Sequence, residues 1–354
     1  MKIIVIGAGI VGAAIADRLS LAGAKVTVLE RVKPGTGASG NSFGWINASF
    51  AETDAYFHLR QNAIKTFRTL CDTLDLAHTA RWHGCLWWED EGDAFEQQFS
   101  ELTRRGHGAC LVDAAEFARL EPAVANPPAR AILTKTEGAA DGDQVALALL
   151  HRAAENGASL ITGCEVQHIL RTGDHVTGVQ TGLGPLDADH VVCATGAWTE
   201  GFLGQCDIPL PMDNKPGLIL TTAPAAPVIR HLIMSPDIHF RQNPDGRITL
   251  GEIFSGDFEG KDAQTFAADL MARLRTRLPG LDGIRLEAIK LGLRPIPAGG
   301  LPVIGPVASA PGLSLAVMHS GITLAPLVGQ LLSDEILGGD PSPLLAGFRP
   351  VRRG

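Results

Sequence analysis

The first thirty residues alternate between apolar runs and a turn, in the order strand, helix, strand. Residues 2–6 form a short apolar run rich in β-branched side chains, typical of a strand buried on both faces of a parallel sheet. The spacing of small and apolar residues over 10–21 predicts a helix that stops at Gly23. A second strand is expected over 24–29. The chain therefore begins with a compact β–α–β unit.

Further apolar periodicities follow, separated by segments rich in Gly, Pro, Ser and Asn. Residues 34–47 are predicted to form a loop, and Pro244-Asp-Gly246 a turn between two strands. Helices are predicted over 55–75, 144–155, 263–278 and 322–337. Strands are predicted over 160–161, 165–170, 176–180, 190–194, 238–242, 247–251 and 313–317.

Changes in composition divide the chain into two interleaved units. From about residue 81 to 128 tryptophans appear and charges become denser, and a proline-rich stretch at 209–227 marks a second departure. The predicted fold class is α/β: a Rossmann-like domain of discontinuous segments with an α+β domain carrying an antiparallel or mixed sheet. We expect the Rossmann-like domain to comprise 1–80, 140–208 and 292–354, and the other domain 81–139 and 209–291.

Composition and charge exclude several classes of protein. With 354 residues and 45% hydrophobic residues, the chain can bury a large core, which excludes a disordered protein. Its net charge is −8, and no cluster of Lys and Arg stands out. Because a phosphate backbone or an anionic membrane attracts a basic surface, nucleic-acid binding and membrane-surface binding are disfavoured.

Cysteine spacing and the longest apolar run both favour a cytoplasmic protein. No two cysteines have CxxC spacing, so we expect core thiols rather than disulfides or a metal site. The apolar run over 3–16 is shorter than the ~20 residues of a membrane helix. It could resemble a secretory signal, but three glycines within residues 7–12 would disrupt that helix. The cysteines are Cys71, Cys85, Cys110, Cys164, Cys193 and Cys206.

The turn after the first strand has the Gly-x-Gly-x-x-Gly spacing of a dinucleotide site. Gly7 suits the tight turn, Gly9 lets a pyrophosphate approach the backbone, and Gly12 lets helix and strand pack closely. The N–H groups that open the helix would meet the pyrophosphate. Glu30, 18 positions after Gly12, would bind both ribose hydroxyls and repel a 2′-phosphate. FAD and NAD remain open at this point, whereas NADP is disfavoured.

Four segments along the whole chain resemble the D-amino-acid oxidase, glycine oxidase and sarcosine oxidase family of FAD-dependent oxidoreductases. The first is the glycine turn with Glu30-Arg31, and the second is the loop 35–42. The third is 191–198, and the last combines Gly292-Leu-Arg-Pro295 with 300–305 and 319–323. The resemblance implies FAD as the cofactor.

The resemblance also implies where the cofactor is held. Arg31 and Ser39 correspond to the adenosine and pyrophosphate contacts, Val166 to a strand beside the adenine, and 194–196 to a turn beneath the dinucleotide. The start of the last helix would point at the flavin pyrimidine edge. Together, motif and resemblance assign cofactor contacts to Gly7, Gly9, Ile10, Val11, Gly12, Glu30, Arg31, Ser39, Asn41, Ser42, Val166, Ala194, Thr195, Gly196, Trp198, Gly321, Ile322 and Thr323.

Substrate residues follow from the same resemblance. Arg294 matches the family's carboxylate-binding arginine, whose alternative role is an ion pair between domains. His239 corresponds to a substrate-facing position on a strand, and Glu252, with Phe254, lies on the partner strand. Glu252 would bind the amine or a basic group, or would be an exposed strand residue. His319 would contact flavin or substrate, or hold a turn.

The family's variations suggest how the flavin is attached and reoxidised. Asn41 stands where some members carry a flavin-linked His, and Gly292 and Leu293 stand where others carry a Cys, so non-covalent FAD is expected. Thr249 stands where the sarcosine oxidase branch has an oxygen-activating Lys, which slightly favours a dehydrogenase.

The leading hypothesis is an enzyme that oxidises a C–N bond by hydride transfer to flavin N5, giving an imine that hydrolyses. Its substrate would be a D-amino acid, an imino acid or an N-substituted glycine, and its acceptor oxygen, a quinone or a partner protein. One alternative is a non-catalytic or electron-transferring flavin subunit of a hetero-oligomer. Another is an NAD-linked dehydrogenase, which the C-terminal motif disfavours. An oligomer is compatible with the sequence.

Overall fold

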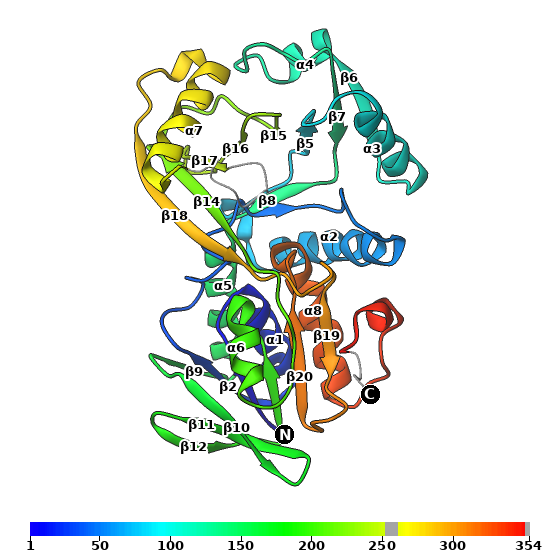
Figure 1. Cartoon of the computed structure of the whole chain (residues 1–354), viewed down its shortest axis with the longest axis vertical. Coiled ribbons are helices and arrows are strands. Elements are labelled where there is room, and N and C mark those ends of the chain that lie inside the picture. Colours follow the sequence, from blue (N-terminus) through cyan, green and yellow to red (C-terminus); the bar gives the residue numbers. More distant parts are fainter. Residues whose placement is uncertain (252–260, 351–354) are drawn as a thin grey trace.

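The computed structural model describes residues 1–251 and 261–350, and two large sheets dominate it (Figure 1). The six-stranded sheet near the N-terminus has the order β19-β20-β13-β1-β2-β9, and its strands run parallel except β19. The fold is therefore α/β with multiple sheets, as predicted. The strands of this sheet are β1 (Lys2–Ile6), β2 (Lys25–Glu30), β9 (Ser159–Thr162), β13 (His190–Cys193), β19 (Val303–Pro306) and β20 (Leu313–Val317).

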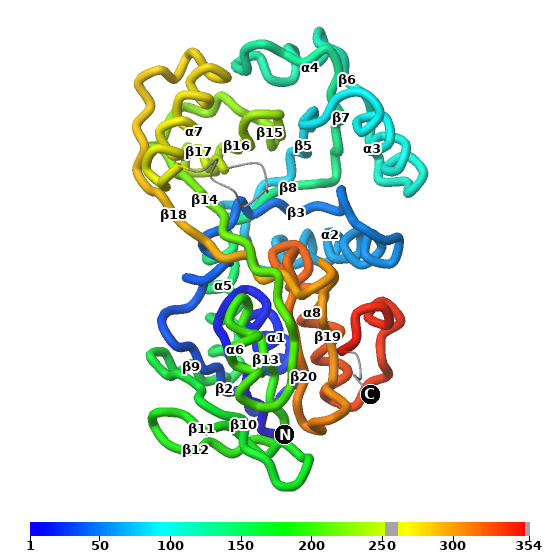
Figure 2. Tube along the Cα trace, viewed as in Figure 1, coloured from blue at the N-terminus to red at the C-terminus, as the bar shows by residue number. Residues whose placement is uncertain are grey.

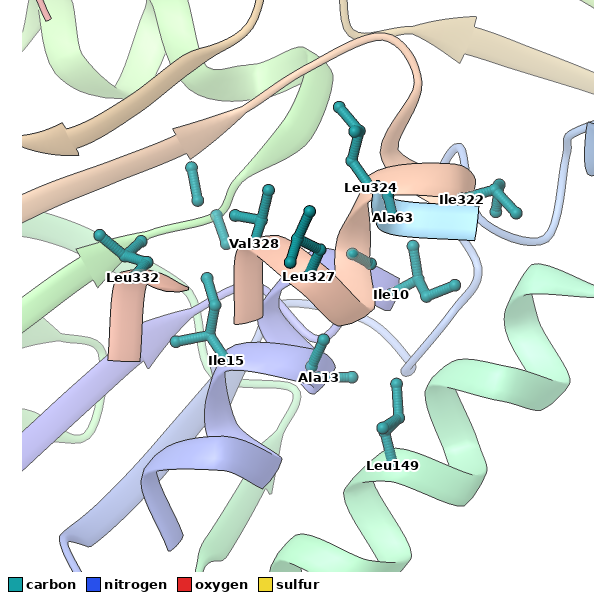
Figure 3. Packing of buried hydrophobic residues seen from close by; sticks show 14 of the residues in the cluster. Ile10, Ala13, Ile15, Ala63, Leu149, Ile322, Leu324, Leu327, Val328 and Leu332 are labelled. Carbon is teal, nitrogen blue, oxygen red and sulfur yellow. The ribbon is translucent and has the colours of Figure 1, made fainter. Parts of the chain in front are cut away.

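One face of this sheet is covered by helices. Ile3 and Val5 of β1 belong to a core that they share with these helices. Figure 3 shows Ile15 of α1 packed near Val328 and Leu332 of α8. The helices contributing to this core are α1 (Ile10–Leu21), α2 (Asp54–Leu74), α5 (Gly142–Glu155) and α8 (Gly321–Ile336).

The opposite face of the same sheet packs against a small antiparallel sheet. Ile4 and Ile6, which alternate with the helix-facing residues of β1, join a second core there. Strand β1 is thus buried on both faces, which confirms the interpretation of its continuous apolar run. This layer contains β10 (Val166–Thr172), β11 (His175–Thr181), β12 (Gly184–Asp187) and the short helix α6 (Thr199–Gly204).

The second large sheet has the order β18-β14-β17-β16-β15-β5-β7-β6 and is antiparallel except for the pair β5–β15. Helices α4 (Ala114–Leu120) and α7 (Ala263–Arg277) contribute to the core on one face, and α3 (Gly92–Arg104) packs on part of the other. The strands are β5 (Cys85–Trp87), β6 (Ala109–Asp113), β7 (Arg130–Thr134), β14 (Lys215–Thr222), β15 (Leu232–Met234), β16 (His239–Gln242), β17 (Ile248–Gly251) and β18 (Leu286–Arg294).

A second small sheet lies between the two large ones, where Figure 2 shows β3 and β8. It consists of β3 (Trp45–Ile46), β8 (Gly138–Ala140) and β4 (Ala80–Arg81), so it joins chain segments from both sides. The expected domain limits stay a prediction; β18 crosses the one placed at residue 292. The short 3₁₀ helices are Leu76–His78, Gly196–Trp198, Pro279–Leu281 and Pro343–Phe348.

Most predicted helices and strands are present within one or two residues of the expected bounds. Many other elements were not predicted, among them the strands β5, β6, β7, β14, β15, β18 and β19 and the helices α3 and α4. Strand β18 has its apolar residues Ile289, Leu291 and Leu293 on the exposed face. Because this reverses the usual apolar-in, polar-out pattern, the sequence did not indicate a strand there. The loop predicted over 34–47 also contains the two-residue strand β3. Within the described ranges, the helices are all too short or too polar to cross a bilayer.

The contact between α1 and α8 gives a first testable prediction. A Cβ atom on Gly329 would lie 2.7 Å from the carbonyl oxygen of Ala14, so Gly329→Ala should push the helices apart. We expect the free energy of unfolding to fall by about 1–3 kcal/mol, measured by urea denaturation. Gly201→Ala is the matched control, because this helical glycine has open space around its Cβ position. An equal effect of both substitutions on stability would contradict a close α1–α8 contact at Gly329.

Candidate active site

A cavity of about 830 Å³ runs along the carboxyl ends of β1, β2 and β13 and continues beneath the eight-stranded sheet. Its walls come from both large sheets, from the first turns of α1 and α8, and from the segment 29–52. A crevice at the carboxyl ends of parallel strands is the common ligand site of open α/β sheets. Within the described residues, this cavity is the leading candidate for a functional site.

Glycines allow close backbone contacts at the α1 end of the cavity. A Cβ on Gly12 would lie 2.0 Å from the carbonyl oxygen of Gly7, and one on Gly7, whose φ is +101°, would lie 2.5 Å from that of Ala194. Only glycine permits this close approach of the first turn, α1 and the end of β13. Gly9 lines the cavity at the N-terminus of α1. The three glycines therefore occupy the positions expected of a dinucleotide turn.

Polar groups at this end are held by hydrogen bonds. Ser39 accepts the N–H of Ile10 at 2.9 Å, while the N–H groups of Val11 and Gly12 follow in a first turn that lacks intrahelical acceptors. The carboxylate of Glu30 accepts the N–H groups of Ala8 at 2.9 Å and Val32 at 2.8 Å. Because both carboxylate oxygens are anchored, Glu30 lies at the cavity wall in one orientation.

At the α1 end of the cavity, the cation of Arg31 lies beside the aromatic ring of Trp198. The guanidinium of Arg31 lies 4.9 Å from the ring centre of Trp198 and 3.5 Å from the carboxylate of Glu165. Val166 and Trp198 line the cavity together with Arg31. Ala194, Thr195 and Gly196 also line it. These sequence-predicted residues are therefore brought to one place by three separate chain segments.

The loop after β2 folds back on itself beside β18. The side-chain amide of Asn41 donates to the carbonyls of Thr36 and Gly37, both at 2.9 Å, and Ser42 accepts the N–H of Gly44. A Cβ on Gly292 would lie 2.5 Å from the carbonyl of Asn41. The loop and β18 thus approach through backbone contacts, and Asn41 and Ser42 line the cavity as predicted.

The beginning of α8 also lies at the cavity. Gly321 and Ile322 line it, but Thr323 does not. The hydroxyl of Thr323 instead accepts the N–H of Asn47 and donates to the carbonyl of Trp45. Thr323 therefore connects the helix to the segment that carries β3, a structural contact that the sequence did not predict.

The fully buried carboxylate of Glu137 organises the segment 45–49. It accepts hydrogen bonds from the N–H groups of Ala48 and Ser49, the hydroxyls of Ser49 and Thr134, the indole of Trp45 and the ring of His107. Burial alone would raise the pKa of Glu137, but the hydrogen bonds from His107 and Ser49 lower it below its usual value. The carboxylate stays ionised and fixes this cavity wall.

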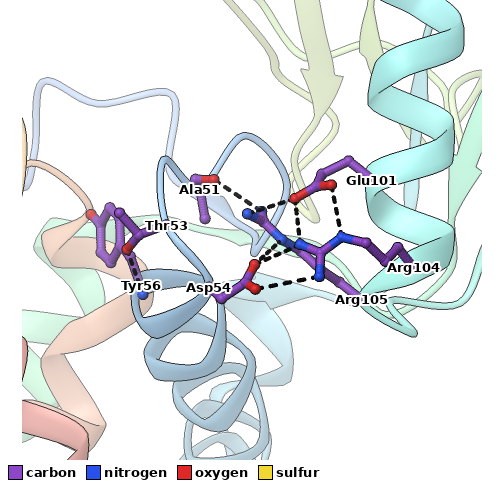
Figure 4. Close-up of polar contacts among 7 residues, drawn as sticks. All are labelled: Ala51, Thr53, Asp54, Tyr56, Glu101, Arg104 and Arg105. Carbon is purple, nitrogen blue, oxygen red and sulfur yellow. Dashed lines mark hydrogen bonds and ion pairs between the residues drawn. The ribbon is translucent and has the colours of Figure 1, made fainter.

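A second set of polar contacts holds the next residues (Figure 4). Arg105 of the turn after α3 donates to the carbonyl of Ala51 at 2.9 Å. Asp54 at the start of α2 binds Arg104 at 2.7 Å and Arg105 at 2.9 Å. These arginines lower the pKa of Asp54, Arg104 through its hydrogen bond most of all. The start of α2 is thereby tied to the end of α3.

Arg294 lines the part of the cavity beneath the eight-stranded sheet, at the end of β18. On the neighbouring strand, a Cβ on Gly217 would lie 2.9 Å from one Nη atom of Arg294 and 3.0 Å from its Nε. The guanidinium therefore rests over the backbone of Gly217, where any side chain would displace it. The sequence predicted Arg294 but carried no signal for Gly217, because strand pairing alone brings the two together.

His239 is 1% exposed and lines the same part of the cavity. Its Nε2 atom lies 3.2 Å from the carboxylate of Glu89, a residue that the sequence did not single out. Glu89 and Asp90 follow β5 and both line the cavity. The predicted role of Glu252, with Phe254, falls outside the described residues.

His319 precedes α8 and has its side chain exposed to the cavity. Protein atoms nevertheless surround the ring on most sides. This burial, followed by the charges of Arg60 and Arg294, lowers the pKa of His319 to about 4. The ring is therefore neutral near pH 7 and can serve as donor or acceptor. Lys215 adds to the same effect.

Arg60 was also missed, although the sequence contained a signal. It stands on the apolar face of α2, spaced with Tyr56, Ala63 and Phe67, where a cation is unusual. The structure brings Arg60 to the cavity, where it donates to the carbonyl of Ser49 at 2.8 Å. Three further wall residues that the sequence did not single out, Asn47, Ser49 and Phe50, follow strand β3.

Comparison with known proteins identifies the family and the fold. The model of the FAD dependent oxidoreductase family matches residues 2–335. A glycine oxidase from Pseudomonas aeruginosa is 28% identical over 364 residues, covering 99% of both chains. A crystal structure of glycine oxidase from Geobacillus kaustophilus superposes with a TM-score of 0.89 at 22% identity, covering 100% of this chain and 99% of that one.

A structural match with another activity shows how widely the fold is used. The L-proline dehydrogenase from P. horikoshii superposes with a TM-score of 0.86 at 22% identity, over 99% of this chain and 96% of that one. At these identities the structural matches establish the fold and leave the substrate to the site itself.

The role of Glu137 can be tested by removing its charge alone. Glu137→Gln places an amide among donors that need an acceptor, so we expect a loss of about 2–4 kcal/mol in the free energy of unfolding. Chemical denaturation measures this loss. Glu155→Gln, at a side chain 62% exposed, is the control and should change stability by less than about 0.5 kcal/mol. Equal stability of the two variants would show that the hydrogen bonds accepted by the Glu137 carboxylate do not stabilise the fold.

Proposed function

Because the chain belongs to the family of FAD-dependent oxidoreductases, we propose that it oxidises the C–N bond of an amino acid or secondary amine. One observation carries the proposal: a single cavity joins the dinucleotide turn at α1 to Arg294 under the eight-stranded sheet. A cofactor and a carboxylate-bearing substrate can therefore meet in one enclosed space. The names of the relatives, which include glycine oxidase, support this class of substrate.

The residues at the α1 end fit FAD. Gly9 leaves the backbone open beside the first N–H groups of the helix, which suits a pyrophosphate. Glu30 would bind the ribose hydroxyls, and Arg31 with Trp198 would hold the adenosine. Ser39 would support the pyrophosphate through its hydrogen bond to Ile10. The isoalloxazine would then occupy the part of the cavity beneath the eight-stranded sheet, between β18 and the start of α8.

Arg294 would bind the substrate carboxylate through its fork of donors. FAD, when bound, supplies the oxidation by accepting a hydride at N5. His239 with Glu89 would face the substrate from β16, and neutral His319 would hydrogen-bond flavin or substrate from the start of α8. Glu252 is proposed as an additional contact for the amine. The imine product would then hydrolyse.

Two finer points concern attachment and reoxidation of the flavin. Asn41 binds its own loop and carries no group that forms a flavin bond, which supports non-covalent FAD. Among the described wall residues Lys33, near Glu30, is the one lysine, and Thr249 is hydrogen-bonded to Asn243 away from the cavity. We therefore propose a dehydrogenase that uses an acceptor other than oxygen, to be tested by comparing turnover with oxygen and with an artificial dye.

Anaerobic reduction of the bound flavin tests the function directly. The protein would be mixed with a panel of D- and L-amino acids, imino acids and N-substituted glycines, and bleaching of the flavin absorbance recorded. We expect at least one class of substrate to reduce the flavin on the time scale of catalytic turnover. A flavin that no amine reduces would favour a subunit that only binds or passes on electrons, and a colourless protein would exclude both.

Replacing Arg294 separates carboxylate binding from the chemistry. We expect Arg294→Leu to raise KM for carboxylate substrates by about 10²-fold or more, since a bidentate charged contact is lost. Gly217→Val should raise KM in the same direction by displacing the guanidinium. Steady-state kinetics measure both changes, with Arg119→Leu, at an exposed surface pair, as the control. An unchanged KM in Arg294→Leu would refute this role.

The low pKa of His319 predicts an acid-sensitive fold. Between its usual value near 6.5 and about 4, the unfolded chain binds a proton that the folded ring does not, so stability falls as the pH is lowered through this window. His319→Asn should therefore lose less stability than the wild type between pH 7 and pH 5. Thermal unfolding at several pH values measures the slopes, and parallel slopes would contradict the prediction.

A further inference from the structure

Arg60 is a buried cation without an acidic partner. It is 7% exposed, and across residues 1–251 and 261–350 no carboxylate forms an ion pair with it. Its contacts are neutral: the carbonyl of Ser49, the hydroxyl of Ser320, and the ring of Tyr56, 4.6 Å from the guanidinium carbon. The buried Nε atom has no hydrogen-bond partner. Burying a charge in this way is costly unless an anion compensates for it.

The start of α8, where Arg60 contacts Ser320, has no side-chain cap. Ser320 is the residue before the helix, a position where serine normally accepts an N–H of the first turn. Here its side chain accepts no such bond, and its hydroxyl accepts instead from the guanidinium of Arg60. The first turn also contains no acidic residue. The positive end of a 16-residue helix and a guanidinium therefore lie together, and both lack a counter-charge.

Both features face the cavity. Arg60, Ser320 and Gly321 line its wall, and the neighbouring His319 has its side chain exposed to the same space. The charge of Arg60 contributes, after burial, to the lowered pKa of His319. A field that disfavours a proton on His319 favours a negative charge in the cavity beside it. An anion bound or formed there would offset the cost of burying Arg60.

This inference, which rests on the proposed function, identifies that anion by the charge balance of the reaction. A neutral amine that gives up a hydride becomes a cationic imine, and the flavin ring that accepts the hydride gains one negative charge. The phosphates would lie at α1 and the substrate carboxylate at Arg294. We infer that Arg60, acting with the uncapped end of α8, stabilises the negative charge of the reduced flavin and so raises its reduction potential.

Sulfite provides a probe that does not depend on turnover. It adds to oxidised flavin and leaves a negative charge on the ring, so its affinity reports the local positive potential. We expect Arg60→Met in the FAD-loaded enzyme to weaken sulfite binding at least tenfold. A tenfold change in the two-electron equilibrium corresponds to about 30 mV in reduction potential, to be measured with a reference dye. Arg60→Lys should stay within about threefold of the wild type.

Arg68→Met is the matched control. Arg68 lies two turns further along α2, stacks on Trp82 at 4.2 Å and donates to the carbonyl of Thr136, but does not line the cavity. The Arg68→Met substitution removes the same charge and a similar stacking contact from the same helix, so we expect this variant to keep the wild-type affinity for sulfite. If Arg60→Met does not fold, Arg60→Gln replaces it, since the amide can still donate to Ser49 while the charge is lost.

The outcomes distinguish this role from its alternatives. Full FAD occupancy with unchanged sulfite affinity and potential in Arg60→Met would overturn the inference while leaving the proposed function intact. A rise in KM alone would assign Arg60 to the substrate instead and would also overturn it. A wild-type protein that binds FAD but is not reduced by any amine would refute the proposed function, whereas the sulfite comparison could still be made.

Discussion

The architecture depends on backbone segments that touch without intervening side chains. Gly12 lies against Gly7, and Gly7 against Ala194, at distances where a Cβ atom would collide with a carbonyl oxygen. The same constraint recurs where Gly292 of β18 meets Asn41. Because these contacts draw α1, β13, the loop after β2 and β18 together, the cavity can pass continuously from one large sheet to the other.

Charge is distributed unevenly along this cavity. The α1 end carries the fixed carboxylate of Glu30 beside open helix N–H groups, an arrangement suited to binding hydroxyls and phosphates together. Beneath the eight-stranded sheet the cavity is lined by Arg60, Arg294 and the start of α8, and Glu52, Glu89 and Asp90 line it as well. The two ends therefore differ in the groups that they offer a ligand: helix N–H groups and a fixed carboxylate at α1, and two guanidinium groups with acidic neighbours beneath the eight-stranded sheet.

The wall between these ends is positioned from a distance. Glu137 lies on no part of the cavity surface, yet its carboxylate collects the N–H groups and side chains that shape the segment 45–49. Arg105 holds the following residues through Ala51. A buried polar network with all its hydrogen bonds made rigidifies the parts of the fold that it joins, here the segment 45–49 of the cavity wall.

The amino-acid sequence by itself determined the β–α–β unit, most helices and the glycine turn, because these features follow from local spacing of apolar residues and from backbone freedom at particular glycines. It also indicated Arg294 through a local motif. Only the tertiary structure decided that Gly217 would clear space for Arg294, that Glu89 would meet His239, and that Arg60 would reach Ser320. Such contacts join residues far apart in the chain, and no local pattern records which strands pair or which helix ends meet.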